Sequence, residues 1–358
     1  MNMDILEILY TREFRKVAYN VRKLSLDAKK ILLLGPRGAG KSTIIYDYLY
    51  QMPKGSFLYI DFDDFRIRGI DIGKELSSFI KKHHIRLLVL EHFDFSFEIP
   101  SCEEVIISAC QKRSLDGFTV QTLYPLDFEE FISFDKRELN LEAIFSAYAI
   151  SGTFPAIFGQ QKGDFVKVYQ SFLTCFAKDE LQMSILQLLS SHQGTVVSIH
   201  SLFLELKERM KVSKDTFYAY TKKLQDENVI FLVEKFGQTK SGKKLYLIDF
   251  ALRSVLSFEK DFIKRFENII FLELLKRDYE LYYTDAFDFY LPKEDKVILS
   301  IPFLPSNLIE SKLERLNKHF MDLRVKSVQV VTMEVEKVYE QNGITFELIP
   351  FWSFATSL

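Results

Sequence analysis

Gly35-Pro36-Arg37-Gly38-Ala39-Gly40-Lys41-Ser42 is the stretch that decides the fold of the first part of the chain. It matches the pattern G-x-x-x-x-G-K-[S/T], it follows the apolar run 31–34, and a helical pattern begins directly after it. Glycines let a backbone wrap closely around phosphate groups, and the amides and the positive end of a helix dipole attract their charge. The spacing therefore predicts a phosphate-binding loop between a buried strand and a helix.

The residues of this loop have distinct expected roles. Lys41 is expected to reach the β- and γ-phosphates and the Ser42 hydroxyl to ligate Mg²⁺, so that ATP or ADP with Mg²⁺ is the expected cofactor. The residues expected to surround the nucleotide are Gly35, Pro36, Arg37, Gly38, Ala39, Gly40, Lys41, Ser42 and Thr43.

Two further strand ends offer polar groups to this site. The apolar run 86–90 ends in Glu91, a carboxylate that can bind Mg²⁺ directly or through water; alternatively, Glu91 only ends a strand at the surface. Ser108 follows the apolar run 105–107 and stands where a sensor of the γ-phosphate is expected, or is an ordinary strand-end serine. The catalytic candidates are therefore Glu91 and Ser108, and the metal ligands expected are Ser42 and Glu91.

Length and composition limit the class of protein. A chain of 358 residues predicts two or three domains, and 47% apolar with 27% charged residues excludes a disordered or collagen-like chain. A formal net charge of −2 means that any nucleic-acid-binding face must be local. No apolar run approaches the roughly 20 residues of a membrane span and no signal-peptide pattern opens the chain, so a cytoplasmic protein without a membrane partner is expected. Cys102, Cys110 and Cys175 show no metal or disulfide spacing and are expected to be reduced, packed side chains.

The order of apolar and helical patterns predicts the architecture. Strands expected at 31–34, 57–60, 86–90, 105–107 and 119–123 alternate with helices at 41–51, 71–83, 127–134 and 138–150. Such alternation is typical of a parallel sheet covered by helices on both faces. Helices at 178–191, 199–209 and 213–227, followed by a hairpin at 229–234 and 244–248, then predict a winged helix-turn-helix. A helix at 259–277 precedes strands near 279–284, 287–291, 296–301, 327–332 and 344–349, with a helix at 306–320 between them.

Several segments, taken in this order, resemble the AAA-type (AAA+) P-loop ATPases that carry a C-terminal winged helix and a restriction-endonuclease-like domain of unknown function. The similarity covers nearly the whole chain and lies in the Gly-Pro-Arg start of the phosphate loop and in 58–64, 125–131, 152–155, 247–252, 266–274 and 349–352. It implies an α/β P-loop NTPase with a parallel sheet and helical lid, then a winged helix-turn-helix and an α/β restriction-endonuclease-like domain. The domains implied are 1–124 (nucleotide-binding), 125–177 (lid), 178–258 (winged helix) and 259–358 (nuclease-like).

The chain departs from that family at positions that matter for hydrolysis. Members usually carry Leu-Asp-Glu where this chain has Leu90-Glu91-His92, and Gly-Arg where it has Gly117-Phe118. Arg113 is near enough in sequence to substitute for that arginine, although spacing alone does not assign the role. Nucleotide binding is therefore expected, whereas rapid hydrolysis is not.

The resemblance also allows the last domain to be compared with the residues that an active nuclease of this fold requires. A nuclease of this kind needs a carboxylate at one strand end and Glu-x-Lys on the next strand, to hold a metal and orient water. Asp288 matches the first requirement, but Ser300 and Pro302 stand at the Glu and Lys positions. The chain is therefore not expected to be an active nuclease.

A basic face is expected on the winged helix. Phe217, Tyr220 and Leu224 recur at helical spacing and should face the core. Residues 207–244 hold ten basic and five acidic side chains, so DNA phosphates are one expected partner; a protein partner with solvated lysines is the alternative. The lysines expected to contact DNA are Lys214, Lys222, Lys240, Lys243 and Lys244.

Together these patterns favour a slow ATPase or nucleotide-dependent switch in which ATP·Mg²⁺ sets the position of the later domains, with the segment 125–176 as transmitter. The alternatives are a DNA-binding regulator with nucleotide as a structural ligand, and a protein-interaction scaffold.

Overall fold

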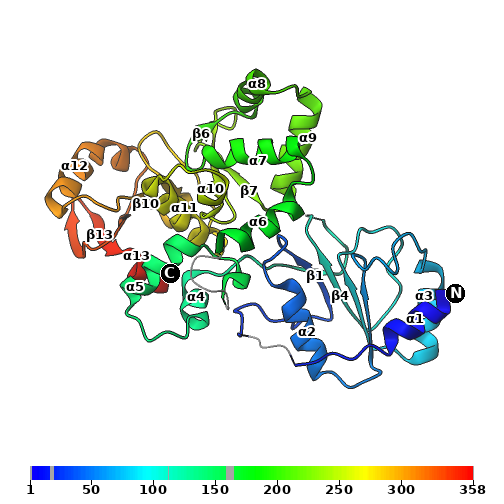
Figure 1. The fold of residues 1–358 in the computed structure, drawn as a ribbon. Helices are drawn as coiled ribbons and strands as arrows, with labels where there is room; N and C mark the ends of the chain where they lie inside the picture. Colours follow the sequence, from blue (N-terminus) through cyan, green and yellow to red (C-terminus); the bar gives the residue numbers. More distant parts are fainter. Residues whose placement is uncertain (1, 17–19, 112, 159–164, 358) are drawn as a thin grey trace. The chain divides into compact units, whose positions relative to one another are not determined.

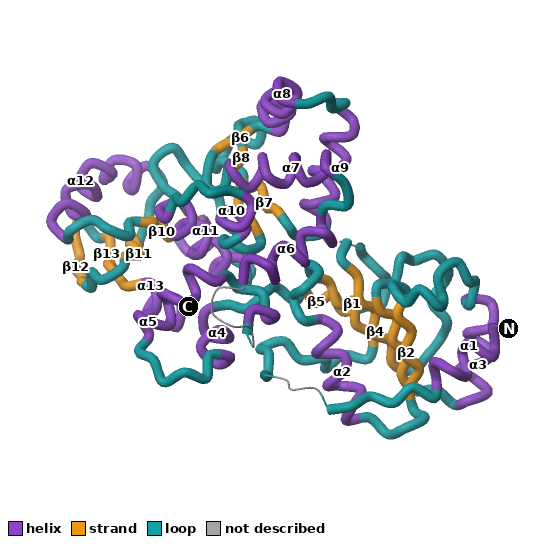
Figure 2. The backbone as a smooth tube through the Cα atoms, in the orientation of Figure 1, coloured by secondary structure: helices purple, strands orange, loops and turns teal. Residues whose placement is uncertain are grey.

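The computed structural model describes residues 2–16, 20–111, 113–158 and 165–357. These residues form two compact units (Figures 1 and 2). Unit 1 comprises the described residues up to Tyr124 together with 226–228, and unit 2 comprises the rest.

Unit 1 is built on a parallel sheet with the strand order β2-β3-β4-β1-β5. Its strands are β1 (Lys30–Leu34), β2 (Phe57–Asp61), β3 (Leu87–Glu91), β4 (Glu104–Ala109) and β5 (Thr119–Thr122), and its helices are α1 (Asn2–Tyr10), α2 (Lys41–Gln51) and α3 (Gly73–His83). The strands expected from the apolar runs are present, and α2 has the predicted bounds. The α/β layout with a parallel sheet is confirmed.

Helices cover both faces of this sheet, as Figure 1 shows. Side chains alternate between the faces along each strand. Ile31 and Leu33 pack with Ile45 of α2, whereas Leu32 packs in a second core with Phe79 of α3 and residues of α1. Burial on both sides explains why β1 and β3 read as uninterrupted apolar runs.

The carboxyl ends of the parallel strands meet at one edge of the sheet. Asp61, Glu91 and Ser108 lie side by side in register on β2, β3 and β4. The loop after β1 lies at the same edge, because β1 pairs in parallel with β4. Ligands of open α/β sheets bind at this edge, where strand order changes direction. The fold therefore brings the predicted phosphate loop and the predicted strand-end residues together.

Unit 2 begins with helices and continues with two sheets. Its first helical elements are α4 (Phe128–Phe134), α5 (Leu141–Ser151), the 3₁₀ turn η1 (Pro155–Ile157) and α6 (Phe165–Phe176). Next come α7 (Glu180–Ser191), β6 (Val196–Val197), α8 (Ile199–Arg209), α9 (Lys214–Asp226), β7 (Ile230–Val233) and β8 (Lys243–Leu247), with an antiparallel sheet in the order β6-β8-β7. This is the succession of helices and hairpin that the sequence predicts for a winged helix.

The last part of unit 2 is a mixed sheet with helices. Its elements are α10 (Leu252–Leu256), α11 (Phe262–Leu275), β9 (Phe289–Leu291), η2 (Pro292–Glu294), β10 (Lys296–Ser300), α12 (Ser306–Asp322), β11 (Ser327–Thr332), β12 (Lys337–Gln341), β13 (Ile344–Pro350) and α13 (Phe351–Ser357). The strand order is β12-β13-β11-β10-β9, with β10, β11 and β13 parallel. The strand expected near 279–284 is wrong, because that segment makes only isolated bridges at Tyr282 and Tyr283. The exposed edge strand β12 was not predicted.

Two buried carboxylates tie the helices of 125–176 to the later segments of unit 2. Asp249 accepts hydrogen bonds from the Thr153 backbone amide and hydroxyl, each at 2.6 Å, and from the Tyr169 hydroxyl at 2.7 Å. Glu273 on α11 accepts from the backbone amide of Phe128 at 3.0 Å and from the hydroxyl of Tyr148 at 3.2 Å. Both carboxylates are 0% exposed, so these helices are joined internally to the rest of the unit.

Candidate nucleotide-binding site

The phosphate loop has a backbone that only glycine can follow at key points. Gly35 has φ of 146°, and a Cβ added there would lie 2.2 Å from the carbonyl oxygen of Leu123. Gly40, at the N-cap of α2, has φ of 99° in the left-handed region. Arg22 is buried and donates to the carbonyls of Ala39 and Tyr124, each at 2.7 Å, which fixes the loop against the segment after β5. No pattern in the sequence indicated this role for Arg22.

Lys41 lies folded onto the loop it belongs to. Its ammonium donates to the carbonyl oxygens of Gly35 at 2.6 Å and Pro36 at 3.0 Å, and the side chain is buried. The Cys110 sulfur, just beyond β4, lies 3.9 Å from the ammonium. Burial lowers the pKa of Lys41, since the charged form is poorly solvated there. An anionic phosphate could therefore replace two carbonyls as the partner of this cation.

Glu91 faces the start of α2 and is completely buried. Its Oε1 accepts a hydrogen bond from the Ser42 hydroxyl, and its Oε2 accepts one from the Tyr59 hydroxyl of β2. Glu91 is thus not a strand-end residue at the surface. The two residues predicted to hold the metal, Ser42 and Glu91, are in direct contact.

Tyr59 is a site residue that sequence reasoning missed. Its phenol is 1% exposed, and burial together with the Glu91 carboxylate raises its pKa, so that the hydroxyl remains a hydrogen-bond donor. The only signal in the sequence was a hydroxyl-bearing side chain inside an otherwise apolar strand, and strand tyrosines are common enough to make that signal weak.

Ser108 lies beside Glu91 in the sheet register. It is 0% exposed, and its hydroxyl has no hydrogen-bond partner among the side chains and backbone groups that the structure describes. The interpretation of Ser108 as an ordinary satisfied serine is therefore not supported. An unpaired buried hydroxyl costs free energy, and a ligand at this edge would offer it a partner.

His92, which follows Glu91, is engaged by acidic residues. Its Nδ1 lies 2.8 Å from the Oδ1 of Asp61 and 3.5 Å from the Oδ2 of Asp63. Asp63 also pairs with Arg37 of the phosphate loop at 2.6 Å. The position where the resemblance leads us to expect a second acid is thus part of an ion-pair network with the loop.

Arg113, which was considered as a substitute for the missing arginine, and Phe118, which stands at the arginine's position, lie in different surroundings. Arg113 places its guanidinium 4.3 Å from the centre of the Phe95 ring and is exposed. Phe118 packs against the core that α1 and α3 share with the sheet. Neither residue contacts the phosphate loop in any described interaction.

The donor set at this edge suits a hard cation. Mg²⁺ prefers oxygen ligands and is usually held by one or two carboxylates together with substrate phosphates. The Ser42 hydroxyl and a carboxylate oxygen of Glu91 converge, which fits that requirement. Within the described ranges no cluster of three His, Cys, Asp or Glu side chains could hold a metal alone, so the phosphates would have to supply the remaining ligands.

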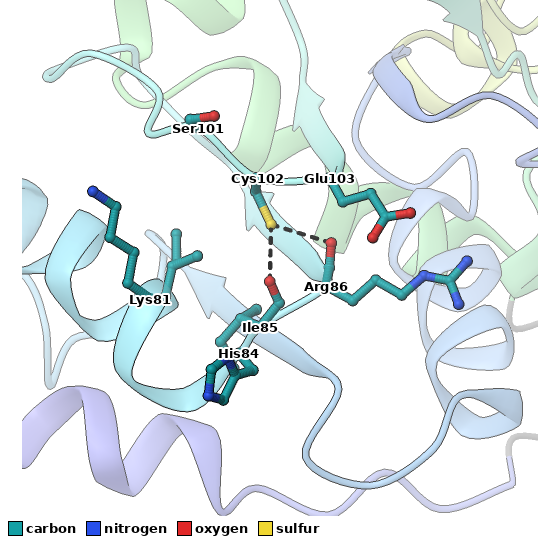
Figure 3. Close-up of a pocket in the computed structure, with 8 residues that line it drawn as sticks. Lys81, His84, Ile85, Arg86, Ser101, Cys102 and Glu103 are labelled. Atoms are coloured by element: carbon teal, nitrogen blue, oxygen red, sulfur yellow. Dashed lines mark hydrogen bonds between the residues drawn. The ribbon is translucent and has the colours of Figure 1, made fainter.

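An open depression of about 560 Å³ lies at the amino ends of β3 and β4, at the edge of the sheet opposite the phosphate loop. Figure 3 shows Lys81, His84 and Arg86 around it, with the Cys102 thiol donating to the carbonyls of Ile85 and Arg86 at 3.4 and 3.2 Å. Burial raises the pKa of Cys102, which favours the protonated thiol. Cys102, Cys110 and Cys175 are all free and half-buried.

The winged segment has the predicted faces but a smaller basic surface than expected. Phe217, Tyr220 and Leu224 are buried, and Lys214, Lys222 and Lys240 are exposed. Two of the lysines expected to contact DNA are instead paired with carboxylates inside unit 2. Lys243 lies 2.6 Å from Glu234, and Lys244 is buried between Glu267 at 2.6 Å and Asp288 at 3.3 Å. Lys244 therefore cannot contact a phosphate backbone.

Asp288, the carboxylate predicted to survive from a nuclease site, is committed to internal partners. Its Oδ2 accepts from the backbone amide of Ser300 at 2.9 Å, and its Oδ1 faces Lys244. Although burial opposes it, the carboxylates of Glu267 and Asp288 raise the pKa of Lys244. A lysine ammonium therefore occupies the space between these two acids. The role of Glu267 was not predicted, because it follows only from contacts with residues far away in the sequence.

No helix in the described part of the chain is long and apolar enough to cross a membrane.

One family model and several known proteins are similar to this chain. Residues 27–94 match the family model described as "AAA domain". An uncharacterized protein of Methanocaldococcus jannaschii is 25% identical in an alignment covering 98% of this chain and 94% of that protein. An uncharacterized protein of Haemophilus influenzae is 23% identical, over 78% of this chain and 84% of that protein.

Two solved structures match this chain at low similarity. The Walker-type ATPase of Pyrococcus abyssi matches with a TM-score of 0.42 and 14% identity, over 64% of this chain and 91% of that chain. The Orc1 protein of Aeropyrum pernix, solved in complex with DNA, matches with a TM-score of 0.31 and 14% identity, over 65% of this chain and 87% of that chain. Over residues 27–94 the chain is thus similar to an AAA domain, and an AAA domain implies nucleotide binding.

Proposed function

We propose that unit 1 binds ATP or ADP with Mg²⁺ and that the protein acts as a slow ATPase or nucleotide-dependent switch. The contact of Ser42 with Glu91, next to Lys41 in a glycine-shaped loop, is the observation that carries this proposal. Lys41 would bind the terminal phosphates, and Ser42 and Glu91 would hold the metal, which neutralises phosphate charge when bound. Ser108 would donate its unpaired hydroxyl to the same ligand.

Slow turnover is supported by the groups that stand where hydrolysis needs help. His92 is held by Asp61 and Asp63, so its ring is not free to orient water as a carboxylate at this position would. Arg113 stacks on a phenylalanine ring. Losing an arginine that stabilises transferred phosphate costs about 10³–10⁵ in rate where such a residue is used. Nucleotide binding depends on the phosphate loop, so we expect it to be retained without these groups.

The later segments are proposed as the part that the nucleotide controls. We assign a helical lid to 125–177, a winged helix to 178–258 and a degenerate nuclease-like module to 259–358. The succession α7 to β8 supports the winged helix, and the pairing of Asp288 with Ser300 and Lys244 supports a module without metal-dependent cleavage.

Equilibrium binding and steady-state hydrolysis on the purified protein test this proposal together. We expect Mg²⁺-dependent binding of a fluorescent ATP analogue, and phosphate release far below the roughly 10 s⁻¹ median of enzymes. Absence of nucleotide binding with and without Mg²⁺ would refute the assignment of unit 1. Turnover near that median would leave binding intact but overturn the proposed slow cycle.

DNA binding is a second candidate, supported by the exposed lysines Lys214, Lys222 and Lys240. Each neutralised phosphate contributes about −0.9 to the slope of log K against log salt concentration. Three lysines therefore predict a slope no steeper than about −3 for duplex DNA, measured by fluorescence anisotropy. A salt-independent or undetectable signal would favour the remaining alternative, a protein partner at this face.

A further inference from the structure

Tyr59 makes a contact that no feature of the phosphate loop requires. It lies on β2, and its hydroxyl donates to the Glu91 oxygen that does not face Ser42. The two oxygens of Glu91 therefore have separate partners: one directed at Ser42 and the start of α2, the other at the tyrosine.

The ring of Tyr59 is held in place on several sides. The rings of Phe14 and Tyr46 approach it edge-on, with centroids 5.2 and 5.5 Å away, and the Arg12 guanidinium lies 4.9 Å from its centre. The hydroxyls of Tyr46 and Tyr59 are 3.1 Å apart, and because Tyr59 gives its proton to Glu91 it accepts from Tyr46. A ring fixed in this way presents its hydroxyl at a defined point.

We propose that Tyr59 is a positioning residue that orients Glu91 for the divalent cation bound with the nucleotide. This inference rests on the proposed nucleotide site. With Oε2 held by Tyr59, Oε1 is directed toward the Ser42 hydroxyl, so the two oxygen ligands of a metal converge before it arrives. Groups that fix a metal ligand in this way typically contribute 10–100-fold to metal affinity.

A role confined to packing predicts something different. A packed tyrosine would affect the stability of unit 1 and would leave the response of nucleotide binding to metal unchanged. A positioning residue acts only on the metal-dependent part of binding, since the loop and Lys41 bind phosphates without help from Glu91. The quantity that separates the two roles is the Mg²⁺ concentration giving half of the metal-induced gain in nucleotide affinity.

The test compares Tyr59→Phe with wild type, using a fluorescent ATP analogue in EDTA and across a Mg²⁺ series. We expect affinity in EDTA to be unchanged and the half-maximal Mg²⁺ concentration to rise about tenfold or more. Tyr10→Phe is the matched control, because it removes a phenol whose hydroxyl bonds to the Gly55 carbonyl at 3.0 Å, and it should leave both quantities unchanged. Replacing Tyr59 with 4-aminophenylalanine restores a donor and should restore the Mg²⁺ response.

Additional outcomes decide the inference. An unchanged Mg²⁺ response in folded Tyr59→Phe overturns it while leaving nucleotide binding standing, whereas a wild type that binds no nucleotide overturns the proposed function itself. Tyr59→Phe combined with Glu91→Gln is also compared with Glu91→Gln alone. Equal Mg²⁺ responses support action through Glu91, and a further loss in the double variant refutes it.

Discussion

Replacing Lys41 with alanine gives a direct test of the phosphate loop. The ammonium donates to the carbonyls of Gly35 and Pro36 and has to exchange these bonds for phosphate oxygens when nucleotide binds. The gain is therefore the difference between a charge-assisted bond to an anion and a bond to a neutral carbonyl.

The size of that difference sets the expected effect. A hydrogen bond that involves a charged group contributes about 1.5–3 kcal/mol, and the ammonium's bonds to neutral carbonyls belong at the lower end of this range and its bonds to phosphate at the upper end. The net of two exchanged bonds is then at most about 3 kcal/mol, and since about 1.4 kcal/mol corresponds to a tenfold change, we expect Lys41→Ala to weaken ATP binding by about tenfold to about a hundredfold.

The variant is expected to stay folded. Burial lowers the pKa of Lys41, so the ammonium is less well stabilised in the loop than in water, and its removal also relieves that penalty. Thermal unfolding of the ligand-free protein checks this. Lys54→Ala is the control, because Lys54 belongs to the same unit and pairs only at the surface with Glu13.

Calorimetry with ATP in the presence of Mg²⁺ measures the outcome. Equal affinities of wild type and Lys41→Ala would refute the reasoning, since Lys41 is the side chain whose ammonium is expected to bind the terminal phosphates. A large loss in Lys54→Ala would show that the effect comes from the overall charge of unit 1.

Three other predictions concern unit 2. Gly152→Ala should destabilise the protein by about 2–5 kcal/mol, because the φ of Gly152 is +82° and the new Cβ would lie 1.8 Å from the Tyr169 hydroxyl. Gly237 is the control, because its φ of +69° is also left-handed but a Cβ there would meet open space. Gly237→Ala should therefore cost only about 1–2 kcal/mol, with both variants measured by urea unfolding. Burial raises the pKa of Asp249 in the folded protein above the value of about 3.9 that it has in the unfolded chain. The unfolded chain therefore ionises first, and the stabilisation that Asp249 provides is lost as pH rises through the folded pKa. The stability difference between wild type and Asp249→Asn should therefore shrink from pH 4 toward neutrality. Plasmid DNA incubated with the protein and Mg²⁺ or Mn²⁺ should remain intact, because Asp288 is paired internally with Ser300 and Lys244. Cleavage by the wild type that is lost in Asp288→Asn would refute this prediction.

The parts of the site that the sequence predicted are those encoded within a few residues. The glycines of the loop motif specify its backbone conformation. The start of α2 and the expected position of Lys41 near the phosphates therefore follow from local spacing. The pairing of Ser42 with Glu91 needed one further assumption, that buried strands run in parallel.

The missed parts depend on residues that the chain brings together from afar. Tyr59 on β2 contacts Glu91 on β3, 32 positions later in the sequence, and no sequence pattern indicates this contact. The basic face is smaller than expected for the same reason. Counting charges between 207 and 244 could not include Glu267 and Asp288, which neutralise Lys244 from later elements.

Errors in secondary structure have a related cause. The apolar and tyrosine-rich segment 279–284 resembles a strand but forms only isolated bridges, from Tyr282 to Tyr290 and from Tyr283 to Lys235. β12 is polar and exposed, and it is a strand only because β13 lies beside it as an antiparallel partner. Edge strands of this kind carry little hydrophobic pattern.

The buried contacts of Asp249 and Glu273 limit how a nucleotide signal could pass through 125–176. Each donor left unpaired in the interior costs about 1–3 kcal/mol, and Asp249 alone serves three donors on Thr153 and Tyr169. Allosteric coupling free energies are typically about 1–3 kcal/mol, so a nucleotide cannot easily break these contacts. The expected transmitter is therefore not a lid that opens within unit 2. If nucleotide moves these helices, the elements holding Asp249 and Glu273 move with them, and a switch would act on unit 2 as a single body.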